Sequence, residues 1–147
     1  MSDENRRYAV DLYNAAWELL DSPDRTIAQD DEVLTLAFAS RYHWGEAEDG
    51  GDEQLAIGDW FIGHVAAHLG LSALAVRFSG RALDRVEATG AGGWLLASAY
   101  EGMARAHACA GDAEGRQRYT VLAEAALDDI DDPEEREVIE DQLRSIP

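Results

Sequence analysis

Residues 59–82, with the sequence DWFIGHVAAHLGLSALAVRFSGRA, decide the fold that we expect for the whole chain. Two runs rich in Ala, Leu, Val and Phe lie on either side of Gly70, and neither alternates in the manner of a β-strand. We expect the first run to belong to a helix over residues 52–69 and the second to a helix over residues 72–89, because glycine ends helices. The stretch therefore predicts an antiparallel helical hairpin.

The same arrangement recurs 41 residues further along the chain, where Gly111 stands in the place of Gly70. When the two glycines are aligned, large residues match large ones and small residues match small ones. The matched pairs are Ile62 with Met103, Gly63 with Ala104, Phe78 with Tyr119 and Ala82 with Ala123. Adjacent helices need such neighbours, because a small residue lets a backbone approach and a large one fills the groove beside it. We therefore expect repeat-like helix pairs over residues 52–90 and 93–131.

The rest of the chain predicts about seven helices in a single domain over residues 1–147. The N-terminal part, residues 3–47, is expected to hold helices over 3–20 and 31–47, separated by a polar turn or short helix. We expect Ser22 to cap the helical segment that follows it and Pro23 to lie in its first turn. The second pair should hold helices over 94–110 and 113–130. A last helix over 133–146 should begin at Asp132 and Pro133. The predicted class is all-α.

The first helix pair resembles the tetratricopeptide repeat in Ile62, Gly63, Gly70, Ala75 and Ala82. The second pair resembles the repeat in Met103, Ala104, Gly111 and Ala123, whereas Arg116 stands where the repeat has alanine. The copies lie 41 residues apart rather than about 34, because the loop over residues 88–93 is long. The resemblance implies antiparallel helical hairpins that stack as a short right-handed solenoid.

Over residues 33–147 the chain is also similar to a group of uncharacterised bacterial proteins with this repeat-like fold. The similarity rests on residues 39–44 (ASRYHW), 58–70 (beginning GDW) and 99–106 (AYEGMARA), followed by Gly111 and Asp112. The ending over residues 141–147 (DQLRSIP) fits as well. This resemblance implies a fold and no reaction.

The charge of the chain argues against nucleic acid and anionic membranes as partners. The chain contains thirty Asp and Glu residues but only twelve Arg residues and no Lys, so its formal net charge is -18. Such a surface repels phosphate groups, whereas nucleic-acid binding needs several cationic contacts. Acidic lipid surfaces are disfavoured for the same reason. A solvated acidic coat explains the composition, and attraction to a basic partner or a cation is the functional alternative.

Cysteine content and the first residues indicate a cytoplasmic protein. Cys109 is the only cysteine, so the sequence provides neither an intramolecular disulfide nor a cysteine-based zinc site. Residues 1–7 (MSDENRR) lack the apolar segment of a signal peptide. No apolar run approaches the about 20 residues that a membrane-spanning helix needs.

The candidate binding groove follows from the repeat resemblance, since the first helix of each tetratricopeptide hairpin lines a concave surface. Aromatic side chains with a polar end are common anchors in such grooves. The candidates are Arg41, Trp60, His64, Tyr100, Met103 and His107. Arg41 would bind an anion there. The structural alternative is that the aromatic and Met residues belong to the core and that Arg41 complements the dipole of its helix.

His64 and His68 suggest a second type of site, because two imidazoles at positions i and i+4 of a helix can chelate one metal ion. A metal site needs at least one more ligand, which His43, His107, Asp59 or another acidic residue could supply. No Glu follows His64, so the metalloprotease motif is absent. Packed or groove-lining histidines are the structural alternative.

Arg77, Arg81 and Arg85 form a stripe along one helix, which suits either a carboxylate-rich or phosphorylated ligand or pairing with nearby acids. We find no catalytic signature and expect neither enzyme activity nor a cofactor. The sequence thus favours a protein-protein interaction module that binds an unknown protein or peptide, and an unpaired end helix would allow a homodimer. The alternative is a small-ligand or metal-binding sensor or enzyme that uses His64 and His68.

Overall fold

The computed structural model describes residues 2–147, with side chains from Glu4 onward, and contains seven α-helices and no β-strand in that part of the chain. The helices are α1 (Ser2–Leu20), α2 (Ile27–Glu46), α3 (Asp52–His68), α4 (Ser72–Thr89), α5 (Gly93–Cys109), α6 (Ala113–Leu127) and α7 (Pro133–Arg144). The prediction of an all-α fold with seven helices is confirmed. None of these described helices combines the length and the apolar content that crossing a bilayer requires.

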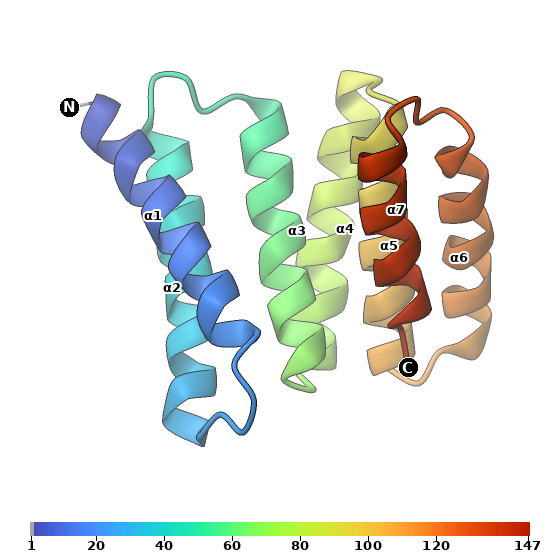
Figure 1. Cartoon of the computed structure of the whole chain (residues 1–147), viewed down its shortest axis with the longest axis horizontal. Coiled ribbons are helices and arrows are strands. Elements are labelled where there is room, and N and C mark those ends of the chain that lie inside the picture. Colours follow the sequence, from blue (N-terminus) through green and yellow to red (C-terminus); the bar gives the residue numbers. More distant parts are fainter. Residues whose placement is uncertain (1) are drawn as a thin grey trace.

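Successive helices run in opposite directions, and three antiparallel pairs stand side by side (Figure 1). α1 packs on α2, α3 on α4 and α5 on α6, while α2 meets α3 and α4 meets α5 between the pairs. α3 also contacts α5, and α7 packs along α5 and touches α6. Consequently α5 has helices α3, α4, α6 and α7 as neighbours, and most of its middle turns are buried.

The two hairpins around Gly70 and Gly111 lie where the sequence predicts them. Both glycines adopt left-handed backbone angles, with φ of 76° at Gly70 and 75° at Gly111, which side chains disfavour. The next amide reaches back to close the helix end, from Leu71 N to Ala66 O and from Asp112 N to His107 O. These bonds satisfy carbonyl groups that the last helical turn leaves free, so each glycine permits a tight reversal of the chain.

The expected start of the second helix is wrong. α2 begins at Ile27, because Thr26 accepts a hydrogen bond from Gln29 N and the Gln29 side chain accepts one from Thr26 N. Ser22 caps no helix and instead donates its hydroxyl hydrogen bond to Glu18 O. The capping box therefore lies four residues after Ser22, and the stretch expected as a polar turn or a short separate helix forms the first turns of α2.

The close approach of α3 and α4 depends on a small residue, as the matched sequence pairs imply. A Cβ atom added to Gly63 would lie 2.3 Å from Ser79 Oγ and 2.9 Å from Ser79 N. Phe61, Ile62 and Val65, which are close to Gly63 in the sequence of α3, are almost completely buried. Ser79 belongs to α4, so the missing side chain of Gly63 allows the α4 backbone to pack directly on α3.

We expect Gly63→Ala to destabilise the fold by about 1–3 kcal/mol, because the added methyl group overpacks the contact with α4. Gly80→Ala is the matched control, since Gly80 lies within a helix but has no atom within 4 Å of an added Cβ. Replacing an uncrowded helical glycine should stabilise the fold by about 0.5–1 kcal/mol. Urea unfolding followed by circular dichroism measures both changes, and a Gly63→Ala protein as stable as wild type would contradict this packing.

Candidate functional site

An aromatic groove of about 340 Å³ lies between α1 and α7, with α3 and α5 beneath it. Figure 1 shows α1 and α7 on either side of α3. The lining residues come from five helices: Tyr13 and Trp17 of α1, Ala56, Ile57 and Trp60 of α3, Ala82 and Val86 of α4, Trp94, Leu95, Ser98 and Ala99 of α5, and Glu135, Val138, Ile139 and Gln142 of α7. Most of these side chains are apolar, which is typical of ligand-binding pockets.

Four aromatic residues give the groove its character: Tyr13, Trp17, Trp60 and Trp94. The rings of Trp17 and Trp60 lie 6.2 Å apart between centroids and are tilted by 34°, and Tyr13 meets Trp17 edge-on at 6.3 Å. Such offset and edge arrangements stabilise aromatic clusters beyond the area that they bury. Trp17 comes from α1 and Trp60 from α3, so the cluster also joins the first helical pair to the second.

A buried ionic network holds the Trp60 ring in place. The Trp60 indole nitrogen donates a hydrogen bond to Glu101 Oε1 at 3.2 Å, and Arg105 Nε donates to Glu101 Oε2 at 2.9 Å. Arg105 also donates through Nη2 to Gln142 O and Ser145 Oγ, both at 2.8 Å. Burial raises the pKa of Glu101, and the Arg105 guanidinium opposes that rise. The network therefore connects α3, α5 and the C-terminal helix directly beneath the groove.

Gly102 makes room for this network. A Cβ atom at Gly102 would lie 2.8 Å from Trp60 Cδ1 and 3.0 Å from Trp60 Nε1, so a side chain there would displace the indole. Gly102 is buried in the middle of α5, where glycine is otherwise unfavourable. Close approach of the Trp60 ring explains why glycine is suitable at this position.

His64 lies behind the aromatic residues. Its ring stacks on Trp60 at 4.8 Å and approaches Trp17 at 5.2 Å and His68 at 4.5 Å. His64 is 5% exposed, and its Nδ1 atom has no hydrogen-bond partner in the structure. Burial, reinforced by His68 and Arg105, lowers the pKa of His64 well below its ordinary value of 6.5. The side chain is thus neutral at neutral pH.

The paired histidines do not gather a metal-ligand set. The metal alternative requires a third ligand beside His64 and His68, whereas residues 4–147 contain no group of three or more His, Cys, Asp or Glu side chains placed to hold an ion. His43 contacts Asn5 and Tyr8, and His107 contacts Asp112 and Tyr119. Both side chains therefore have other partners at other places in the fold.

The six residues named from the sequence as a candidate groove do not converge. Trp60 lines the aromatic groove and His64 lies behind it, but Met103 is buried in a core cluster with Ala56, Leu83, Val86 and Ala99. Tyr100 stacks near Tyr119 of α6 at 6.4 Å. His107 stacks on the same Tyr119 ring at 5.3 Å and bonds to Asp112. Tyr100 and His107 thus form part of the contact between α5 and α6.

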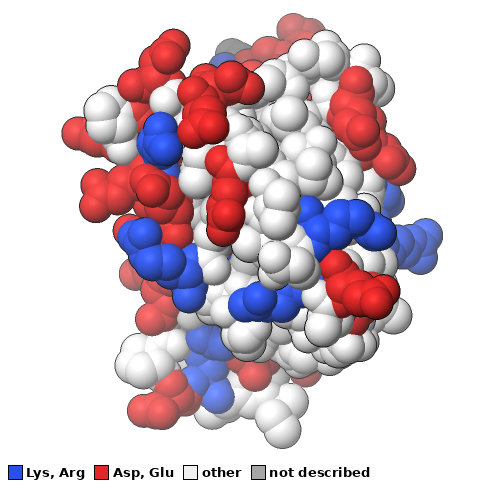
Figure 2. Space-filling view, turned by 90° about the vertical axis from the view of Figure 1, so that its right-hand side faces the viewer, with Lys and Arg blue, Asp and Glu red and all other residues white. Residues whose placement is uncertain are grey.

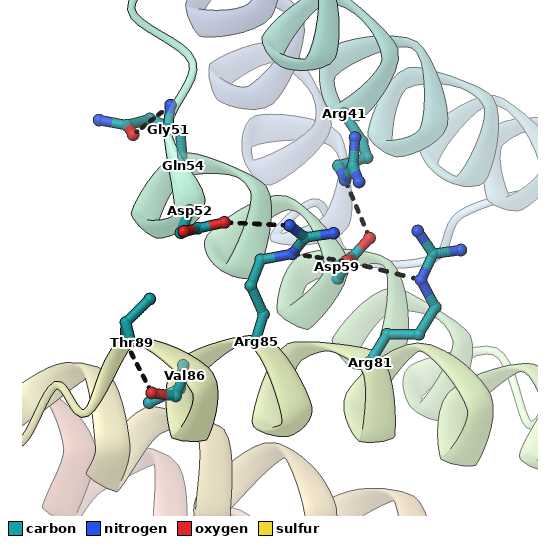
Figure 3. Close-up of polar contacts among 9 residues, drawn as sticks. All are labelled: Arg41, Gly51, Asp52, Gln54, Asp59, Arg81, Arg85, Val86 and Thr89. Atoms are coloured by element: carbon teal, nitrogen blue, oxygen red, sulfur yellow. Dashed lines mark hydrogen bonds and ion pairs between the residues drawn. The ribbon is translucent and has the colours of Figure 1, made fainter.

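Arg41 lies in a different cluster, where three arginines surround the fully buried Asp59 (Figure 3). Arg41 Nε donates to Asp59 Oδ1 at 2.9 Å, and Arg81 Nε and Arg85 Nε lie 3.6 and 3.9 Å from Oδ2. Arg85 also reaches Asp52 at 3.3 Å. Much of the predicted arginine stripe therefore serves to neutralise a buried carboxylate, and Arg41 joins α2 to α3.

Sequence reasoning missed most residues of the groove: Tyr13, Trp17 and Trp94 on its walls and Glu101 and Arg105 beneath it. Glu101 and Arg105 stand four residues apart, a spacing that is common among exposed ion pairs on helices. Two signals were available. Trp60 and Glu101 are equivalent positions when the hairpins are aligned on Gly70 and Gly111, and Gly102 stands in the interior of a predicted helix, where glycine is unfavourable.

Comparison with protein families, with curated proteins and with solved structures finds no match for this chain. The assignment of a site therefore depends on the geometry alone. The aromatic groove is the feature of the described surface that best combines volume, apolar lining and a defined arrangement of polar groups.

We expect Asp59→Asn to destabilise the protein by about 3 kcal/mol, because it leaves three guanidinium groups facing one another without their buried counter-charge. Asp52→Asn is the matched control, since Asp52 pairs with Arg85 but its side chain is 64% exposed. An exposed pair contributes about 0–1 kcal/mol. Chemical unfolding measures both substitutions, and equal effects of the two would contradict a structural role for Asp59.

His64 should make the stability of the protein depend on pH. Because its pKa is lower in the folded protein than in the unfolded chain, the unfolded state binds more protons as the pH falls below 6.5. The free energy of unfolding should therefore fall with decreasing pH, by at most about 1.4 kcal/mol per pH unit from this group. His64→Phe keeps a ring on Trp60 and removes the titration. If the free energy of unfolding changes with pH in the same way for wild type and variant, the pKa of His64 does not differ between the folded and unfolded states, which would contradict this prediction.

Proposed function

We propose that this chain is a cytoplasmic interaction module with a short, right-handed, tetratricopeptide-like solenoid, and that the aromatic groove binds a segment of a partner protein. The open groove with four aromatic side chains is the observation that carries the proposal. Three antiparallel helix pairs, the contact of α3 with α5, and α7 packed beyond them are compatible with a solenoid that ends in a capping helix.

The composition of the groove suits anchoring side chains of a peptide. Trp and Tyr are enriched among the residues that dominate binding energy, particularly where they line a well-packed pocket. The network through Glu101 and Arg105 fixes Trp60, so little conformational freedom is lost when a ligand binds. A volume of about 340 Å³ accommodates a few side chains, and it also lies in the range of small-ligand pockets. A small apolar ligand is therefore the second candidate.

The groove can be closed from within by Val138→Arg. Val138 lines the groove on α7 and is 56% exposed, so a long arginine side chain there should cover the indole rings without disturbing the core. Val121→Arg is the matched control, because Val121 is 51% exposed on α6 and does not line the groove. Circular dichroism should show both variants folded.

Affinity purification from native lysate with quantitative mass spectrometry then compares wild type with the two variants. We expect a stoichiometric partner that binds wild type and Val121→Arg and is reduced at least about tenfold by Val138→Arg, as for loss of one binding anchor. A partner that binds all three proteins equally would place the binding surface outside the groove and contradict the proposal.

A further inference from the structure

The electrostatic character of the aromatic groove restricts what it can bind. Among the lining side chains that the structure describes, Glu135 is the one charged residue, and none is arginine or histidine. Glu135 is exposed at the start of α7, directly after the exposed Glu134. A ligand in this groove therefore meets apolar and aromatic walls and a carboxylate at the edge.

The indole rings add a second electrostatic preference. The face of an aromatic ring carries negative potential, and Trp attracts a cation more strongly than Tyr or Phe. Trp17 and Trp94 line the groove and are partly exposed, whereas Trp60, which also lines it, is 8% exposed and has the His64 ring stacked on it. A guanidinium group suits such walls because it is planar, weakly hydrated and able to stack on rings while its stem packs against apolar side chains.

The buried guanidinium of Arg105 beneath the groove is already compensated. Arg105 pairs with Glu101, and its Nη2 donates to Gln142 O and Ser145 Oγ. Arg105 is 4% exposed, so it presents almost no surface to a ligand. The lowered pKa of His64 keeps that ring uncharged at neutral pH. Neither group therefore cancels the negative character of the groove.

The field of the whole molecule acts in the same direction. The chain has a formal net charge of -18, which raises the local concentration of cationic ligands. Figure 2 shows acidic side chains gathered along the upper and left edges of one end of the molecule, with arginines between them. On α7 the acidic residues outnumber the basic ones. The helix contains five acidic residues, Glu134, Glu135, Glu137, Glu140 and Asp141, and two basic residues, Arg136 and Arg144.

We propose that the anchor bound by the aromatic groove is an arginine side chain in a basic, otherwise apolar segment of the partner protein. The guanidinium contacts the partly exposed indole rings of Trp17 and Trp94, and Glu135 attracts it at the edge of the groove. This inference rests on the proposed function, since it names the chemistry of the segment that the groove accepts.

Two tripeptides that differ in one charge test the proposal. Acetyl-Leu-Arg-Leu-amide carries the guanidinium, and acetyl-Leu-citrulline-Leu-amide has nearly the same shape without the charge. Each is titrated into protein labelled with ¹⁵N at tryptophan, and the indole N–H signals are followed by NMR. We expect the arginine peptide to shift the signals of Trp17 and Trp94 and to bind about five- to tenfold more tightly than the citrulline peptide.

Two variants with the same net charge locate the effect. Glu135→Gln should lower the affinity for the arginine peptide about threefold or more and leave the citrulline peptide unaffected. Glu114→Gln removes one charge from an exposed position on α6, away from the groove, and should change neither affinity beyond the small general effect of the charge.

The outcomes separate this inference from the proposed function. Equal affinities for the two peptides, or tighter binding of the citrulline peptide, would overturn the arginine anchor and leave a groove that binds apolar segments. Tighter binding of the arginine peptide with equal losses in Glu135→Gln and Glu114→Gln would overturn the location in the groove. No indole shift with either peptide up to about 20 mM would overturn both proposals.

Discussion

The buried carboxylate of Glu101 is the constraint on which the groove depends. It is fully buried, and it is satisfied by the Trp60 indole on one oxygen and by Arg105 on the other. A buried charge is tolerated only when it is paired and hydrogen-bonded, so these groups must keep their relative positions. Because Trp60 belongs to α3, Glu101 and Arg105 to α5, and Gln142 to α7, the requirement fixes three helices at once.

Two buried carboxylates, those of Asp59 and Glu101, connect the central helices. Asp59 gathers Arg41, Arg81 and Arg85 from α2 and α4, while the adjacent Trp60 turns to Glu101 of the next hairpin. Consecutive residues of α3 thus join it to the helices before and after it. The aromatic groove lies on the side between α1 and α7, where Trp17 and Trp94 are partly exposed and Trp60 is almost buried. The function that we propose uses the surface that this arrangement leaves open.

The hairpins were predictable because glycine and small residues act locally, as Gly70, Gly111 and Gly63 show. The groove was less predictable, since the face of a helix depends on its neighbours. α5 has four helical neighbours, so Tyr100 and His107, which share a side of the helix with apolar residues, could turn toward α6 as readily as toward a groove. The position of Trp17 in the groove depends on how α1 packs against α3, and no local sequence pattern predicts that packing. Of the six residues that the sequence analysis named for a groove, Trp60 is the one that lines the observed groove.

Hydrogen exchange of the four tryptophan indole groups, measured by NMR, tests most directly whether the network under Trp60 holds the groove in place. Exchange reports how often a hydrogen bond opens to solvent. We expect the Trp60 indole proton to exchange far more slowly than those of Trp17 and Trp94, because Glu101 accepts its hydrogen bond in a buried site. A Trp60 proton that exchanges as fast as the other two would show that the network is open in solution, and the preformed groove would then be contradicted.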